Sequence, residues 1–255
     1  MNRRRSSSCR AFTLIEAVLV IGIVAVITAM ILPNFIDEIR GHSLEGSARQ
    51  VRSMLTLVGA NACFDGVRYR LRFPELGEED LMGGNRQPLI EREDDPLEEP
   101  EVFNAVTDPW AIGATLLEGV WCAEVRRGRP TATILKNLEK TRSDVQDALD
   151  KAFEDFSPER PPVIFEADGT TGWFTFVLTD APPGTELDDL ENYDRIEVLF
   201  EGDTGMVWLQ RPFYEEELDL FEEKNWPVVL RQDFLSPKVL TEDDVLELYE
   251  VRINQ

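Results

Sequence analysis

The sequence holds few of the residues that build catalytic or metal centres. It has one histidine, His42, and no Cys-x-x-Cys pair, so a zinc site is not expected. The G-x-S-x-G, H-E-x-x-H and phosphate-loop patterns do not occur either. The sequence therefore predicts no catalytic residue, no metal ligand and no cofactor, and we do not expect an enzyme.

Basic residues are also scarce beside acidic ones. The 255-residue chain has 26 lysines and arginines against 49 aspartates and glutamates, which gives a formal net charge of −23. A surface of this sign repels the phosphates of nucleic acids, so no nucleic-acid partner is expected. The length is sufficient for one large domain or two small ones.

The most prominent feature that is present is an apolar run from Phe12 to Leu32. It holds 21 residues, of which Glu16 alone is charged. A helix of this length reaches roughly 30 Å, which matches the hydrocarbon core of a bilayer. The run follows a leader, residues 1–11, with four arginines that would stay on the cytoplasmic side. No A-x-A cleavage site of a secretory signal peptide follows it. The sequence predicts a membrane-spanning helix over 12–32.

The acid inside this run needs an explanation. A carboxylate in a membrane costs a few kcal/mol and is usually found where it meets a partner. Residues 10–16, with the sequence R-A-F-T-L-I-E, resemble the processing motif of type IV prepilins and type II secretion pseudopilins. The family usually has Gly where this chain has Ala11.

This resemblance implies specific roles for three residues. A prepilin peptidase, which is also an N-methyltransferase, would cut between Ala11 and Phe12 and methylate the new amine of Phe12. Glu16 would meet the amine of a neighbouring subunit as a filament assembles, and a cationic amine would make the buried carboxylate tolerable.

The helix is expected to continue beyond the apolar run to about residue 62. Pro33 removes one helix hydrogen bond, so a kink is expected there. Beyond it, apolar residues recur at steps of three and four and define one helical face, made of Leu44, Ala48, Val51, Leu55, Val58 and Ala62. That face needs a cover, which predicts a globular domain packed on the upper half of the helix.

Two cysteines lie in the predicted domain, residues 63–255. Outside the cytoplasm, a disulfide between Cys63 and Cys122 is permitted, but the sequence does not say whether the two meet. Cys9 lies in the leader and would be lost.

Alternation of apolar and basic residues predicts a half-exposed strand at Val67–Phe73. Its arginines, Arg68, Arg70 and Arg72, could contact nucleic acid, but a solvated strand face, or pairing with the acids of this domain, is the favoured interpretation. Residues 74–162 are interpreted as an inserted loop and helix region. Within it, Trp121–Arg127 is expected as a strand and Ser143–Phe156 as an amphipathic helix.

A second resemblance lies later in the chain. Val163–Thr170 is similar to the strand and turn I-x-F-x-x-D-G of the minor pseudopilin H and its pilus relatives, and Trp173–Leu178 is expected as its return strand. Arg195–Phe200 and Gly205–Leu209 are expected to form another hairpin. The turn between those two strands resembles the T-G-x-V ending of that family.

Together these features predict an α+β fold, with a long N-terminal helix packed on a mainly antiparallel β domain, as in pilins. The expected function is structural: a minor pseudopilin of type II secretion, held in the inner membrane with its C-terminal domain in the periplasm. The expected partners are the prepilin peptidase and other pseudopilins or pilins in a filament. A minor pilin of a type IV pilus, and a membrane-anchored binding domain or enzyme, remain as alternatives.

Overall fold

The computed structural model describes residues 14–74, 87–113, 115–137, 160–182, 185 and 187–250. The chain divides into two units, Met1–His42 and Ser43–Gln255. Across the described residues, no helix combines the length and the apolar character that crossing a membrane requires. The membrane span expected over 12–32 stays a prediction.

The first unit consists, in its described part, of the first 29 residues of helix α1 (Leu14–Asp65). The helix begins inside the F-T-L-I-E motif and its assignment runs through Pro33. Apolar side chains such as Val18, Ile21 and Val24 are exposed along it. The predicted kink at Pro33 is not tested by the described residues.

In the second unit, α1 buries one face and then ends at a glycine. All six residues of the predicted apolar face are at most 3% exposed, and Met54 joins them in the core. The prediction of that face from its three- and four-residue spacing is confirmed. Gly66, with φ of +66°, follows the helix and donates its backbone N–H to the Ala62 carbonyl at 2.9 Å.

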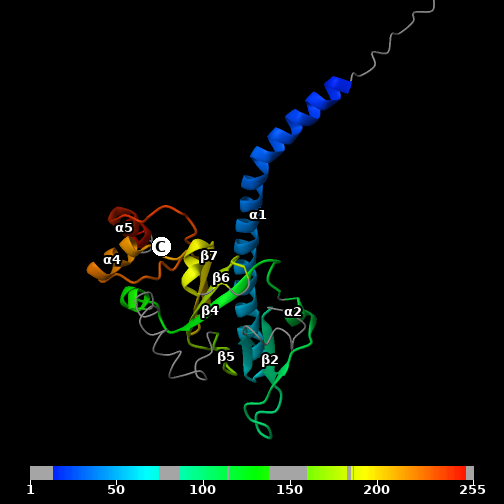
Figure 1. The fold of residues 1–255 in the computed structure, drawn as a ribbon. Helices are drawn as coiled ribbons and strands as arrows, with labels where there is room; N and C mark the ends of the chain where they lie inside the picture. Colours follow the sequence, from blue (N-terminus) through cyan, green and yellow to red (C-terminus); the bar gives the residue numbers. More distant parts are fainter. Residues whose placement is uncertain are drawn as a thin grey trace, which may run out of the picture. The chain divides into compact units, whose positions relative to one another are not determined.

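The second unit contains two four-stranded antiparallel sheets (Figure 1). The first sheet has the order β3-β2-β1-β5, and its strands are β1 (Tyr69–Arg72), β2 (Leu89–Glu93), β3 (Phe103–Ala105) and β5 (Val163–Phe165). The second has the order β4-β6-β7-β8, and its strands are β4 (Trp121–Arg127), β6 (Trp173–Thr179), β7 (Arg195–Glu201) and β8 (Met206–Gln210). The β7–β8 hairpin confirms the pairing expected there.

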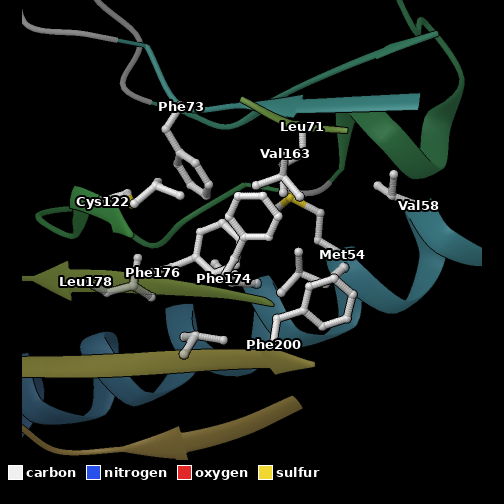
Figure 2. Packing of buried hydrophobic residues seen from close by; sticks show 14 of the residues in the cluster. Met54, Val58, Leu71, Phe73, Cys122, Val163, Phe174, Phe176, Leu178 and Phe200 are labelled. Carbon is white, nitrogen blue, oxygen red and sulfur yellow. The ribbon is translucent and has the colours of Figure 1, made fainter. Parts of the chain in front are cut away.

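The main core joins both sheets to the second half of α1. Figure 2 shows Met54 and Val58 of α1 beside Leu71 of β1 and Phe176 and Phe200 of the second sheet. Several aromatic rings pack against one another here; those of Phe165 and Phe200, for example, lie 5.7 Å apart. The predicted packing of the upper helix on a β domain is therefore present within this unit.

The region 74–162 contains more than loop and helix. Its described residues supply β2 and β3 to the first sheet, β4 to the second, and the short helix α2 (Pro109–Ile112). It therefore contributes strands to both sheets of the fold. The amphipathic helix expected at Ser143–Phe156 lies outside the described residues.

The expected hairpin of Val163–Thr170 and Trp173–Leu178 is wrong. β5 pairs with β1 in the first sheet, whereas β6 pairs with β4 and β7 in the second. The Asp168–Gly169 turn carries the chain from one sheet to the other. Gly169 has φ of +82°, and a Cβ there would lie 2.6 Å from the Gly59 carbonyl oxygen of α1. The turn thus needs glycine both for its conformation and for its close approach to the helix.

The chain after β8 forms a second, smaller core. Helices α4 (Glu215–Glu223) and α5 (Glu242–Glu250) belong to it. Residues 132–137, which are also helical, contribute to the same cluster. The buried apolar members are Ala132, Phe213, Leu218, Phe221, Val228, Leu230, Leu240 and Val245. We call residues 211–250 the C-terminal lobe.

Candidate functional site

The N-terminal motif lies at the very start of the described chain. Ala11 and Phe12, the predicted cleavage and methylation positions, lie outside the described residues. Glu16 is the third residue of α1, in its first turn, and the surroundings of its side chain lie outside the description. The cleavage, the methylation and the role of Glu16 in assembly therefore stay predictions.

Two of the arginines around β1, Arg68 just before the strand and Arg70 within it, contact acidic partners in the same domain. Arg68 makes a two-pronged contact with Glu93 of β2, with Nε–Oε2 and Nη2–Oε1 distances of 2.7 and 2.6 Å. Arg70 donates from Nε to Glu91 Oε2 at 2.5 Å, and its guanidinium lies 4.5 Å from the ring centre of Phe103. The guanidinium of Arg68 also lowers the pKa of Glu93. Of the two favoured interpretations, a solvated strand face or pairing with the domain's own acids, the structure has the pairing for these two arginines.

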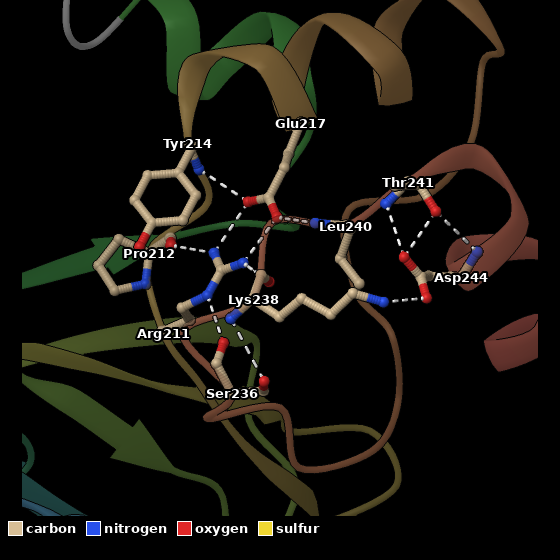
Figure 3. A network of polar contacts seen from close by, with 9 residues as sticks. All are labelled: Arg211, Pro212, Tyr214, Glu217, Ser236, Lys238, Leu240, Thr241 and Asp244. Carbon is tan, nitrogen blue, oxygen red and sulfur yellow. Dashed lines mark hydrogen bonds and ion pairs between the residues drawn. The ribbon is translucent and has the colours of Figure 1, made fainter.

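A buried ion pair in the C-terminal lobe lies at the centre of a network of polar contacts (Figure 3). Arg211 follows β8, and Glu217 is the third residue of α4. Glu217 is fully buried and Arg211 is 8% exposed. Two parallel hydrogen bonds join them, Nη1–Oε2 at 2.8 Å and Nη2–Oε1 at 2.6 Å.

Both partners use their remaining hydrogen-bonding capacity inside the lobe. Arg211 also donates to the carbonyl oxygens of Ser236, Pro212 and Lys238, so all five of its N–H groups are engaged. Glu217 also accepts from the backbone N–H groups of Tyr214 and Leu240, at 2.9 and 2.6 Å. Because every strong donor points inward, the cluster acts as a structural clamp between residues 211–217 and 236–240.

Sequence reasoning did not find this clamp. By itself, the sequence of Phe213–Glu217 indicates only a loop and the start of a helix. The available signal was weak: Glu217 stands three residues after Tyr214, the spacing at which a glutamate can bond back to the N-cap backbone. Nothing local to that stretch indicates Arg211 as a partner or the 236–240 segment as a neighbour.

The possible disulfide is not formed in the structure. Cys63 and Cys122 are both free thiols, the first exposed near the end of α1 and the second buried in β4. The Cys122 thiol donates to the Glu124 carbonyl at 3.4 Å, and burial raises its pKa to about 12. Cys122 thus behaves as a core residue that the exposed Cys63 does not reach.

Metal ligands do not gather in the described part of the chain: it holds no group of three or more His, Cys, Asp or Glu side chains suited to a metal ion. The single histidine, His42, is exposed. In the clusters of charged side chains described above, at β1 and in the lobe, the basic and acidic groups pair with one another.

The chain was compared with known proteins. No protein-family model matches it, and no curated protein matches it. Among solved structures it is similar to the minor pseudopilin EpsH of the type II secretion system of Vibrio cholerae, found in two structures. The identities are 16% and 15%, the TM-scores 0.35 and 0.37, and the alignments cover 67% and 68% of this chain and 98% and 96% of the matched chains. Because both TM-scores are below 0.5, we argue function from the residues of this chain.

Proposed function

We propose that the chain is a structural subunit of a pilin-like filament, namely a minor pseudopilin of a type II secretion system. In this proposal a prepilin peptidase removes residues 1–11 and methylates Phe12. Before assembly, the mature subunit lies in the inner membrane with its second unit in the periplasm. It then joins other pseudopilins through the N-terminal part of α1.

The observation that carries the proposal is the position of Glu16. It is the one charged residue in the 21-residue apolar run, and it lies in the first turn of a helix that extends to Asp65. An unpaired carboxylate in such surroundings costs a few kcal/mol, and a cation from outside the helix offsets that cost. In this proposal cleavage creates such a cation, the amine of Phe12 on a neighbouring subunit, at the same N-terminal end of the helix as Glu16.

The organisation of the second unit supports a structural role. The second half of α1 buries a complete face in the core, so a helix that assembles would carry the two sheets with it. Two of the three arginines that could have formed a basic surface at β1, Arg68 and Arg70, pair with glutamates of β2 instead. This pairing favours secretion over a DNA-uptake pilus, because it leaves β1 a poor contact for phosphates.

The first test is the mass of the mature N-terminus. The full chain would be expressed with and without a prepilin peptidase, and its N-terminal peptide identified by mass spectrometry. We expect a methylated Phe12 as the first residue when the peptidase is present. An intact Met1 under those conditions, or a cut beyond Leu32, would contradict the proposal.

The second test separates assembly from anchoring. Glu16→Gln keeps the shape of the side chain but removes its charge, so the variant should still be cleaved and yet fail to enter sheared filament fractions. Glu38→Gln, outside the apolar run, is the matched control and should assemble as the unchanged chain does. If Glu16→Gln supports normal secretion and assembly, the result contradicts the filament proposal and favours the alternative, a membrane-anchored binding domain or enzyme.

A further inference from the structure

β8 lies at the edge of the second sheet, and a segment of the C-terminal lobe runs beside it. Phe234 donates its backbone N–H to the Leu209 carbonyl at 2.8 Å and accepts from the Arg211 N–H at 2.9 Å. The two strands are parallel at this point. We call residues 231–236 the strap, because they cover the edge that β8 would otherwise offer to another chain.

Asp233 fastens the strap to two other elements. Its Oδ1 accepts from the backbone N–H of Leu209 at 3.0 Å and also from Arg52 Nη2 on α1. The side chains of Arg52 and Asp233 are 30% and 43% exposed, so this ion pair is accessible to water and salt. One half-exposed carboxylate therefore joins the strap, the edge strand and the helix.

The aromatic ring of the next residue adds a second attachment. The ring of Phe234 stacks on that of Phe213 at 6.5 Å with an interplanar angle of 11°, and the Arg211 guanidinium lies 4.9 Å from its centre. Other residues of the strap make contacts too: Arg231 pairs with Glu201 of β7 at 3.1 Å, Leu235 packs against the main core, and the Ser236 carbonyl accepts from Arg211. Much of the remaining lobe is held by its own core.

Two features oppose the closed position of the strap. Arg231 has φ of +52°, a left-handed conformation that is unfavourable for a residue with a side chain. Gln210, at the end of β8, is fully buried, and neither polar atom of its amide has a hydrogen-bond partner among the described residues. A buried amide without partners costs free energy that opening of the strap would recover.

We propose that the strap closes the β8 edge against a second copy of this chain, and that it opens independently of the two sheets. Edge strands present unpaired N–H and C=O groups, and proteins cover them to prevent pairing between copies. An antiparallel pair of two β8 strands is self-complementary, because Leu209 presents both a donor and an acceptor on the outer side of β8. A second copy is therefore the occupant that an uncovered edge accepts.

The test removes the fastening at Asp233 in the full chain, solubilised in detergent. Asp233→Ala removes both contacts, and Asp233→Asn keeps an acceptor for Leu209 but loses the charge that attracts Arg52. Asp203→Ala is the control, because Asp203 is an exposed acid in the turn that precedes β8. Amide hydrogen exchange would be followed at Arg211 and Phe234, with β6 and β7 as internal references.

We expect Asp233→Ala to speed exchange at Arg211 and Phe234 about tenfold or more, as loss of the half-exposed ion pair with Arg52 and of the hydrogen bond from Leu209 implies, while β6 and β7 are unchanged. Asp233→Asn should fall between this variant and the unchanged chain, and Asp203→Ala should have no effect. Equal protection of the strap in all variants would overturn the proposal. So would equal loss of protection in β6 and β7, since the strap would then open only with the sheets.

Association of the variants tests the second half of the proposal. Native mass spectrometry should show a dimer of Asp233→Ala whose fraction rises with concentration, and exchange at Val207 and Leu209 should slow in the same samples. Asp203→Ala should match the unchanged chain. If the strap of Asp233→Ala opens but the chain stays monomeric at every concentration, the edge has another role and the inference is wrong.

Discussion

Replacement of Glu217 by alanine tests whether the buried clamp holds the C-terminal lobe together. The substitution removes a fully buried carboxylate that accepts four hydrogen bonds, two of them from Arg211. Breaking a buried ion pair by removing one partner typically costs about 3–5 kcal/mol, because the other charge is left uncompensated. We therefore expect Glu217→Ala to lower the free energy of opening the lobe by an amount in this range.

Two further variants separate the contributions of the charge, the hydrogen bonds and the unpaired arginine to this loss of stability. Glu217→Gln keeps an acceptor of similar shape but places an NH₂ group against the arginine, so a smaller loss of about 1.5–3 kcal/mol is expected. Glu217→Leu combined with Arg211→Met removes both charges and should recover part of the loss. Recovery should be incomplete, because three carbonyl oxygens that accept from Arg211 would lose their donor.

Hydrogen exchange measures the effect where it occurs. The amides of Tyr214 and Leu240, which donate to Glu217, should exchange roughly 100-fold faster or more in Glu217→Ala, whereas β6 and β7 should keep their protection. Glu216→Ala, an exposed neighbour on the same helix turn, is the matched control. A loss below about 1 kcal/mol would refute the reasoning, and so would equal loss in the sheets, since the lobe has a core of its own.

Three other expectations follow from the second unit. Gly169→Ala should destabilise the fold by about 2 kcal/mol or more in urea unfolding, because it adds left-handed strain and a contact 2.6 Å from the Gly59 oxygen. Gly205→Ala, also at positive φ but with open space around it, should cost only about 1 kcal/mol. In the folded protein a thiol reagent at pH 8 should label Cys63 and spare Cys122, whose pKa is raised to about 12. Since the unfolded thiol ionises near pH 9, the contribution of Cys122 to stability should decline as the pH rises from 9 towards 12, so the difference in unfolding free energy from Cys122→Ala should shrink there.

Local patterns were enough to predict the elements whose partners are near in the sequence. The three- and four-residue spacing from Leu44 to Ala62 identified the buried face of α1, because a helix repeats every 3.6 residues whatever it packs against. The β7–β8 pair was also predictable, since a short turn brings neighbouring strands together. The alternation around Arg68 and Arg70 predicted a half-exposed strand, and the acidic composition made pairing of its arginines one of the two favoured interpretations.

The same patterns could not assign partners that are distant in the sequence. Val163–Phe165 and Trp173–Thr179 have the pattern of two hairpin strands, yet they belong to different sheets: the first pairs with β1, and the second pairs with β4 and β7. The alternation of residues in a strand predicts which of its faces is buried, but not which other strand it will pair with.

The polar contacts that hold the C-terminal lobe show the same limit. Arg211 binds carbonyl groups 25 and 27 positions later, and Asp233 meets Arg52 across 181 positions of the chain. Such contacts depend on how the cores bring segments together, and no short-range spacing encodes that. The charge and the apolar run of the N-terminal motif can be read directly from the residues, whereas the clamp and the strap exist only because packing placed their members side by side.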